Sequence, residues 1–218
     1  KNDVTLQKNI ILTGPNASGK TTLLKTTAIN VIFSQQVGVG FYKTCKILPY
    51  HKIHSYLNIP DTSGRDSLFQ AESRRCKDIL DNIQKHGAQT RHFCIFDELY
   101  SGTNPSEATR SAYAFMSYIS TFSHVDLILT THYVSICSVL EKEHGKHIAN
   151  HQMEVIDNEH VEENTYKMIE GISRREGAVK ILKDMEYPEE LLDTLQNAVF
   201  DNEKKDNIQE DEIESVTV

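Results

Sequence analysis

One stretch near the start of the chain constrains its fold and chemistry more than any other. An apolar run ends at Gly14, four residues follow, and Gly19-Lys20-Thr21 opens a segment with helical periodicity. This is the G-x-x-x-x-G-K-[ST] phosphate loop, with the strand before it and the helix after it that the motif requires. The stretch therefore predicts an α/β fold with a nucleotide site. A chance match within a glycine-containing turn is the weaker alternative.

The chemistry of such a loop assigns roles to its backbone and to two side chains. Inward-pointing N–H groups and the positive end of the helix dipole would hold phosphates. Lys20 would reach the β- and γ-phosphates, and the hydroxyl of Thr21 would ligate Mg²⁺. We therefore expect ATP and Mg²⁺ as the bound cofactors.

Two carboxylates about 75 residues further on predict hydrolysis rather than binding alone. The apolar run His92–Phe96 is followed directly by Asp97-Glu98. At the carboxyl end of a buried parallel strand, Asp97 would support the Mg²⁺ and Glu98 would polarise an attacking water. His132 follows the next apolar strand, so it would lie at the same edge of the sheet and sense the γ-phosphate. The alternative for all three residues is an ordinary solvated strand end.

Composition excludes several other classes of protein. Of the 218 residues, 39% are hydrophobic and 25% charged, as is usual for a soluble globular domain. No apolar run approaches the roughly 20 residues needed to cross a bilayer, and Lys1–Lys8 lacks the apolar core of a signal peptide. No two of the four cysteines have C-x-x-C spacing, so we expect a reducing intracellular compartment, cytoplasm or nucleus, with no membrane association.

Most of the negative charge belongs to the end of the chain. From Asp201 onward there are seven acidic residues and two lysines, a balance of −5, so the preceding 200 residues carry only −3 of the net −8. With few large apolar residues, 201–218 is predicted to be a disordered acidic tail. The overall charge also argues against a surface that coats nucleic acid unaided.

Periodicity predicts alternating strands and helices along the rest of the chain. Two of the strands, Thr44–Leu48 and Lys52–Ile59, could form a hairpin around Pro49, and five further histidines (His51, His54, His144, His147 and His151) are expected at the surface. The other expected strands are Asn9–Thr13, His92–Phe96, Asp126–Thr130, His147–Ile156 and Val161–Ile169, and the expected helices run from Lys20 to about Phe33, Ser67 to about Lys85, Pro105 to about Thr121, Gly177 to Met185 and Pro188 to Val199.

Taken together and in order, the motifs closely resemble the ATPase domain of the MutS family of DNA mismatch-repair proteins, over about Asn2 to Val199. The motifs that carry the resemblance are Thr13-Gly14-Pro15-Asn16 with Gly19-Lys20-Thr21, Ser67 through Glu72, Asp97-Glu98 with Gly102-Thr103, and Thr131-His132-Tyr133. The resemblance implies an ABC-type P-loop NTPase with a mostly parallel central sheet flanked by helices over 1–170. It also implies a small helical dimerisation element over 171–200, before the acidic tail.

The resemblance assigns site residues position by position. Glu98, His132 and Lys20 would be catalytic, Thr21 and Asp97 would hold the metal, and Ser67 would reach across a dimer interface to the partner's γ-phosphate. Asn104 would lie in the segment that faces the other subunit. The cofactor-binding set would be Gly14, Pro15, Asn16, Ala17, Ser18, Gly19, Lys20, Thr21 and Thr22, with Ser67 acting in trans.

The resemblance further implies a homodimer, or a heterodimer with a paralogous subunit. Mismatched or otherwise distorted DNA would be bound by domains that lie upstream and are absent from this chain. The chain departs from the family in Ala17 and Thr21, in an apparent extra residue at Asp66, and in Tyr100-Ser101 where Gly-Arg is usual. Two alternatives stay open: another ABC-type DNA-maintenance ATPase, and a non-hydrolysing module that dimerises on ATP. A transporter subunit is disfavoured because Leu-Ser-Gly-Gly-Gln is absent.

Overall fold

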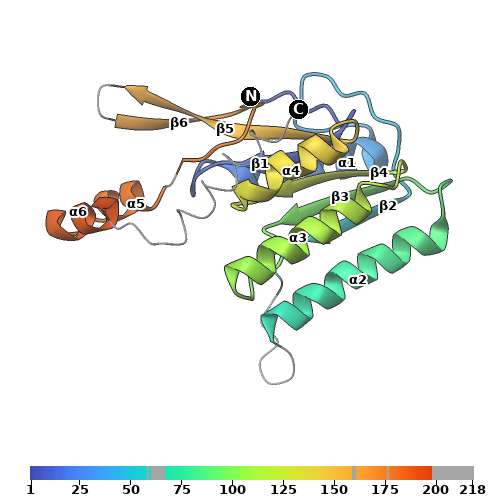
Figure 1. Ribbon diagram of the computed structural model, residues 1–218. Coiled ribbons are helices and arrows are strands. Elements are labelled where there is room, and N and C mark those ends of the chain that lie inside the picture. Colours follow the sequence, from blue (N-terminus) through green and yellow to red (C-terminus); the bar gives the residue numbers. More distant parts are fainter. Residues whose placement is uncertain (58, 60–66, 159–160, 176, 198–218) are drawn as a thin grey trace, which may run out of the picture. The chain divides into compact units, whose positions relative to one another are not determined.

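The computed structural model describes the chain except residues 58, 60–66, 159–160, 176 and 198–218 (Figure 1). The chain divides into two compact units, Lys1–Arg174 and Arg175–Val218. The predicted acidic tail, 201–218, lies outside the described residues, as does most of the segment between β2 and α2. Among the described residues, no helix is long and apolar enough to cross a membrane.

The first unit is an α/β structure built on one six-stranded sheet, as predicted in outline. The strand order is β2-β3-β4-β1-β5-β6; the first five strands run parallel and β6 is antiparallel to β5. The elements are β1 (Asn9–Thr13), α1 (Lys20–Val37), β2 (Lys52–Tyr56), α2 (Leu68–His86), β3 (His92–Asp97), α3 (Pro105–Ile119), β4 (Val125–Thr130), α4 (Val134–His144), β5 (Ile148–Asn158) and β6 (Val161–Glu170).

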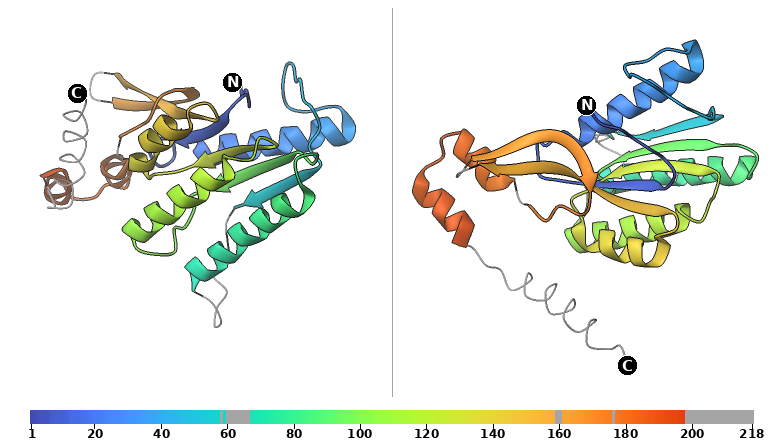
Figure 2. Two further views of the ribbon diagram at one scale, coloured as in Figure 1. Left: turned by 45° about the vertical axis from the view of Figure 1, so that its right-hand side comes forward. Right: turned by 90° about the horizontal axis from the view of Figure 1, so that it is seen from above.

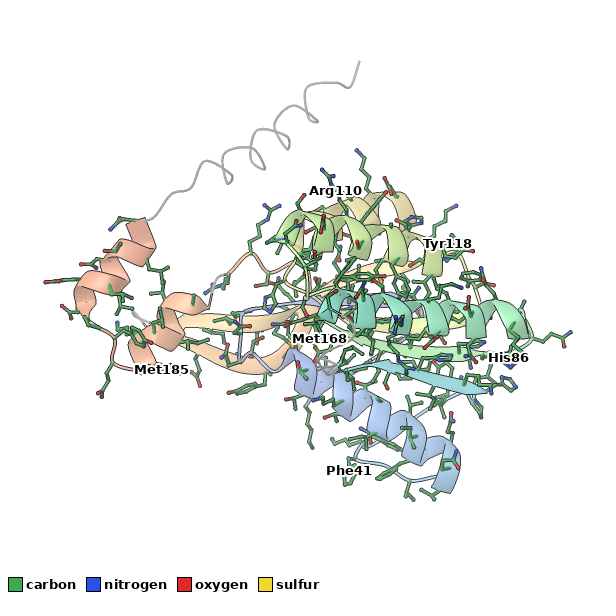
Figure 3. The ribbon with its side chains drawn as sticks, turned by 90° about the horizontal axis from the view of Figure 1, so that it is seen from below. Phe41, His86, Arg110, Tyr118, Met168 and Met185 are labelled. Carbon is green, nitrogen blue, oxygen red and sulfur yellow. The ribbon has the colours of Figure 1, made fainter. Side chains whose placement is uncertain are left out.

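Helices cover both faces of this sheet, which explains why its central strands are apolar without alternation. Buried residues of α2, α3 and α4 pack on one face, with Ile79, Met116 and Leu140 as examples. On the other face, Leu24 and Ala28 of α1 pack against the strands. Figure 2 shows α1 on the side of the sheet opposite α3 and α4, and Figure 3 shows the same separation between Phe41, beyond α1, and the α3 residues Arg110 and Tyr118.

Local capping chemistry fixes the starts of two of these helices. Ser67 caps α2 in a reciprocal capping box with Gln70. Asn104 caps α3 by accepting a hydrogen bond from the backbone N–H of Glu107, and Pro105 occupies the first turn. The second unit contains α5 (Ala178–Asp184) and α6 (Glu189–Asn197), where two short helices are predicted.

The predicted hairpin around Pro49 is wrong. Residues 44–48 form no strand, and β2 pairs in parallel with β3 instead. The connection is held against α1 by side-chain hydrogen bonds: Gln35 accepts from the backbone N–H of Tyr50 at 3.1 Å and donates to its carbonyl at 3.3 Å. These bonds fix the end of the connection, just before β2 begins.

Helix α4 is absent from the prediction because no polar cap marks its start. Its N-cap, Tyr133, makes no side-chain capping bond, although Ile136, Cys137 and Leu140 are buried at helical spacing. The pattern therefore indicates a helix only once the preceding strand is known to end at Thr130.

The prediction that His54 lies at the surface is also wrong. His54 is buried and its Nε2 lies 2.9 Å from Nδ1 of His92, with the two rings stacked. Burial, aided by nearby positive charge, lowers the pKa of each imidazole to about 4. Both rings are therefore neutral at physiological pH and contribute to the packing at the start of β3.

Candidate functional site

The loop between β1 and α1 is a tight turn that only glycine permits at two points. Gly14 and Gly19 have φ of 154° and 97°. A Cβ on Gly14 would lie 2.9 Å from Oγ of Ser18 and 3.1 Å from Cβ of Met153. Ala17 also has positive φ, 60°. The loop therefore turns its backbone closely around a small space at the carboxyl end of β1.

The side chain of Lys20 folds back over this loop. Its Nζ donates hydrogen bonds to the carbonyls of Gly14 at 2.9 Å and Pro15 at 3.1 Å, and the residue is only 6% exposed. Burial lowers the pKa of Lys20, while the negative charges of Glu98 and Asp97 act in the opposite direction. The structure thus holds an ammonium group at the mouth of the loop, beside two carboxylates.

Strand register places Asp97 against the start of α1. Asp97 pairs with Thr130 across β3 and β4, and the Thr130 hydroxyl donates to its carboxylate. The Thr21 hydroxyl lies 3.0 and 3.1 Å from the two carboxylate oxygens of Asp97. The described residues contain no group of three or more His, Cys, Asp or Glu side chains able to hold a metal. The Thr21 hydroxyl and the Asp97 carboxylate are hard oxygen donors. Such a pair fits Mg²⁺, which usually takes one or two protein ligands together with phosphate oxygens and water.

Glu98 and His132 form a second pair at the same edge of the sheet. His132 Nε2 lies 3.0 Å from Oε1 of Glu98, and both side chains are nearly half exposed, at 40% and 46%. The hydrogen bond from His132 lowers the pKa of Glu98 against the opposing effect of burial. Glu98 has a positive φ of 54°, and its N–H donates to the carbonyl of Thr130. The site therefore holds an ionised, partly exposed carboxylate directly after the end of β3.

The structure brings together five predicted residues from the start of α1 and the ends of β3 and β4: Lys20, Thr21, Asp97, Glu98 and His132. The rest of the predicted cofactor-binding set forms the loop around them: Gly14, Pro15 and Ser18 are buried, Gly19 is half-buried, and Asn16, Ala17 and Thr22 are exposed. Among the described residues, the Ser18 hydroxyl is one of few buried side-chain groups with no hydrogen-bond partner.

Ser67 is placed differently. It is exposed at the start of α2, where its hydroxyl accepts a hydrogen bond from the N–H of Gln70. A groove runs along the phosphate loop, α1 and residues 41–48, and Ser67 is not among the described residues that line it. Within one chain, therefore, Ser67 does not contribute to the groove beside Lys20.

Tyr166 is one of the groove residues that were not predicted from the sequence. Tyr166 of β6 is 59% exposed and has a positive φ of 57°. Its ring lies against the phosphate loop, since a Cβ on Gly19 would come within 3.1 Å of it. Asn2 fixes the backbone nearby by donating to the Tyr166 carbonyl and accepting from the N–H of Met168. No local pattern identifies Tyr166, because its position depends on the antiparallel pairing of β6 with β5.

Comparison with known proteins gives consistent matches over this part of the chain. The family model described as MutS domain V matches residues 10–201. The DNA mismatch repair protein Msh3 of Dictyostelium discoideum is 26% identical over 216 residues, covering 92% of this chain and 14% of the relative. Endonuclease MutS2 of Staphylococcus carnosus (strain TM300) is 27% identical over 175 residues, covering 80% of this chain and 21% of the relative. Endonuclease MutS2 of Bacillus cytotoxicus is 27% identical over 211 residues, covering 94% and 25%. The chain thus spans about a quarter or less of these relatives.

Proposed function

Because the chain belongs to the MutS family, matching its domain V, we propose that it is an ABC-type P-loop ATPase domain. It would bind ATP with Mg²⁺ and release ADP and phosphate. The observation that carries the proposal is the convergence of the Thr21–Asp97 pair and the Glu98–His132 pair beside Lys20. An ordinary solvated strand end gives no reason for a buried lysine, a hydroxyl–carboxylate pair and an ionised glutamate to meet.

The binding step follows from the loop geometry. The Lys20 ammonium would exchange its two bonds to loop carbonyls for bonds to the β- and γ-phosphates, which are stronger acceptors because they are charged. Thr21 and Asp97 would hold Mg²⁺, which neutralises negative charge on the transferred phosphoryl group. The N-terminus of α1 adds its dipole to the same place.

The hydrolytic step is assigned to Glu98. Its carboxylate would accept a hydrogen bond from the attacking water and orient it toward the γ-phosphorus, in line with the bond to ADP that breaks. His132 holds this carboxylate by the 3.0 Å contact and would also sense the γ-phosphate. A non-hydrolysing module that dimerises on ATP is the alternative, and a phosphate-release assay separates the two.

Removal of Mg²⁺ tests the proposed function directly. Phosphate release from ATP should stop in excess EDTA and return when Mg²⁺ is added. The reason is that Thr21 and Asp97 carry no positive charge and cannot neutralise the phosphates without the metal ion. Asp97→Asn should raise the Mg²⁺ concentration for half-maximal release by about tenfold or more. Asp81→Asn, on the exposed side of α2, is the matched control. Release at an unchanged rate in EDTA would exclude this site as its source.

Tyr166 is proposed as the platform for the base of the nucleotide. Its exposed ring lies against Gly19, so a base extending from the phosphates could stack on it, an interaction of about 1–3 kcal/mol. Tyr166→Ala should weaken ATP binding about tenfold in a calorimetric titration, whereas Tyr166→Phe should retain the affinity of the original protein. Tyr118→Ala, on α3, serves as the control. If the Ala variant bound ATP as tightly as the Phe variant and the original protein, Tyr166 would not be part of the nucleotide site.

We further propose that the ATPase acts as a dimer, either a homodimer or a heterodimer with a paralogous subunit. Ser67, exposed at a helix N-terminus, would complete the partner's site by contacting its γ-phosphate. The unit that begins at Arg175 would contribute the dimerisation element, which the exposed apolar side chains Met185, Tyr187, Leu191 and Leu195 support.

The role in DNA metabolism is proposed from the relatives. One is named a DNA mismatch repair protein and others endonucleases, and each has a large part that this chain does not match. ATP state in this domain would control the binding of mismatched or otherwise distorted DNA by such other parts. Another ABC-type DNA-maintenance role is the second candidate, and binding of heteroduplex against matched duplex by the longer protein distinguishes them.

A further inference from the structure

A buried carboxylate outside the nucleotide site, that of Glu72 on α2, accepts hydrogen bonds from the loop that follows β3. Glu72 is 2% exposed. Its Oε1 accepts hydrogen bonds from the N–H of Ser101 at 3.0 Å and from the Ser101 hydroxyl at 2.9 Å, and its Oε2 accepts one from the N–H of Gly102 at 3.1 Å. Hydrogen bonds to a charged acceptor are stronger than neutral ones, so this is a firm attachment of the loop to α2.

The same loop is pressed onto the first turn of α2. A Cβ on Gly102 would lie 2.6 Å from Cγ of Leu68 and 2.8 Å from the backbone nitrogen of Phe69. Only glycine fits this contact without a shift of backbone. The ring of Tyr100 also packs on that of Phe69, with centroids 5.6 Å apart. The loop therefore contacts the start of α2 by both polar and apolar groups.

The loop is held in a conformation that it would not adopt alone. Glu98 and Tyr100 are non-glycine residues with φ of 54° and 59°. A left-handed backbone is unfavourable for a residue that has a side chain, so contacts from the surrounding structure must hold this geometry in place. The bond from the N–H of Tyr100 to the Tyr56 hydroxyl at 3.1 Å and the bonds to Glu72 provide these contacts. Without them, the backbone of Glu98 is expected to relax.

The attachment links two groups that serve different nucleotides in the proposed dimer. Glu98 begins the loop and acts on the nucleotide of its own chain, whereas Ser67 caps α2 and acts on that of the partner. On the basis of the proposed function, we infer that Glu72 is a positioning residue. By its hydrogen bonds it makes loop 98–103 and the first turn of α2 move as one rigid unit. A change at one composite ATP site is thereby passed to the other.

The test uses the substitution Glu72→Gln in the full chain. Glutamine retains the volume but places an amide NH₂ against an N–H donor of Ser101 or Gly102, so at least one bond is lost. Glu143→Gln on α4, whose carboxylate accepts from the Tyr113 hydroxyl, is the control. Ser101→Ala, which removes only the hydroxyl donor, is a milder second variant if Glu72→Gln does not fold.

Dimers of two different variant chains distinguish coupling between the two ATP sites from an effect of Glu72 on one site alone. A dimer of one Lys20→Ala chain and one Ser67→Ala chain has one complete site, with Glu98 from the second chain and the serine from the first. Glu72→Gln should slow phosphate release about tenfold when placed on either chain. The inference would be overturned if Glu72→Gln slowed phosphate release only when placed on the chain that supplies Glu98, or on neither chain.

A readout independent of turnover keeps the two proposals distinguishable. Hydrogen exchange in Glu72→Gln should be faster both in loop 98–103 and at 67–70, with α3 and β1 unchanged. Unchanged exchange at 67–70 overturns the coupling. Absence of turnover in the unsubstituted chains, with exchange altered at both segments, overturns the proposed function and leaves the mechanical link in place.

Discussion

Glu98→Gln is expected to stop ATP turnover and leave ATP binding intact. The amide cannot accept a proton or polarise water as the carboxylate does, while Lys20, Thr21 and the loop backbone keep their contacts with the phosphates. A general base contributes typically 10²–10⁴-fold, so phosphate release should fall by about a hundredfold or more. The measurement is single-turnover phosphate release paired with a calorimetric ATP titration of the same sample.

The matched control for this substitution is Glu143→Gln, which removes an exposed carboxylate from α4. It should retain the turnover of the unsubstituted chain. Release by Glu98→Gln at the unsubstituted rate would show that another group activates the water. Loss of binding together with turnover would show that Glu98 acts on nucleotide affinity instead.

Lys20→Ala is expected to abolish ATP binding itself. Lys20 is the buried cation of the phosphate loop. Its removal leaves the carbonyls of Gly14 and Pro15 without their donor in the free protein, and the phosphates without theirs in the complex. Loss of a charge-assisted contact to two phosphates should raise the dissociation constant about a hundredfold or more. Lys20→Met, which keeps most of the volume, should show the same loss and exclude collapse of the loop as its cause.

The control is Lys25→Ala, further along α1 and outside the groove. It should leave the dissociation constant within about twofold of the original. Tight, Mg²⁺-dependent ATP binding by both Lys20 variants would contradict the assignment of the phosphate loop.

The parts of the site that the sequence predicts are those carried by contiguous residues. The loop at Gly14–Thr21 specifies its own strand and helix, and Asp97-Glu98 ends an apolar strand whose place in a parallel sheet follows from general rules. The family, the α/β class and the mostly parallel sheet are confirmed. The roles of the individual site residues remain predictions.

The rest depends on contacts between residues distant in sequence. Tyr166 reaches the loop only through the pairing of β6 with β5, and Glu72 meets Ser101 only because α2 lies beside the loop after β3. His54 reads as a surface residue until His92 is placed beside it. Alternation at Thr44–Leu48 predicts a strand, but these residues form none and β2 pairs with β3 instead. In each case the local sequence pattern allows more than one conformation or environment, and tertiary packing selects the one observed.

The structure gives a physical account of one departure from the MutS family, that at Tyr100. The resemblance implies glycine at the position of Tyr100, and the φ of 59° there is a conformation that glycine adopts without cost. The tyrosine is 8% exposed, and its ring packs against Phe69 and Phe115. Burial of this ring therefore offsets the backbone strain that the substitution introduces.

The measurement that tests the central claim most directly is phosphate release from a mixture of Lys20→Ala and Ser67→Ala chains. Each variant alone should be nearly inactive, because every site in it lacks either the lysine or the serine from the partner. In an equimolar mixture, half of the dimers combine both chains and hold one complete site of two, so release should recover to about a quarter of the unsubstituted rate. Full activity of Ser67→Ala alone, or no recovery on mixing under conditions where the chains dimerise, would contradict a composite ATP-hydrolysing site.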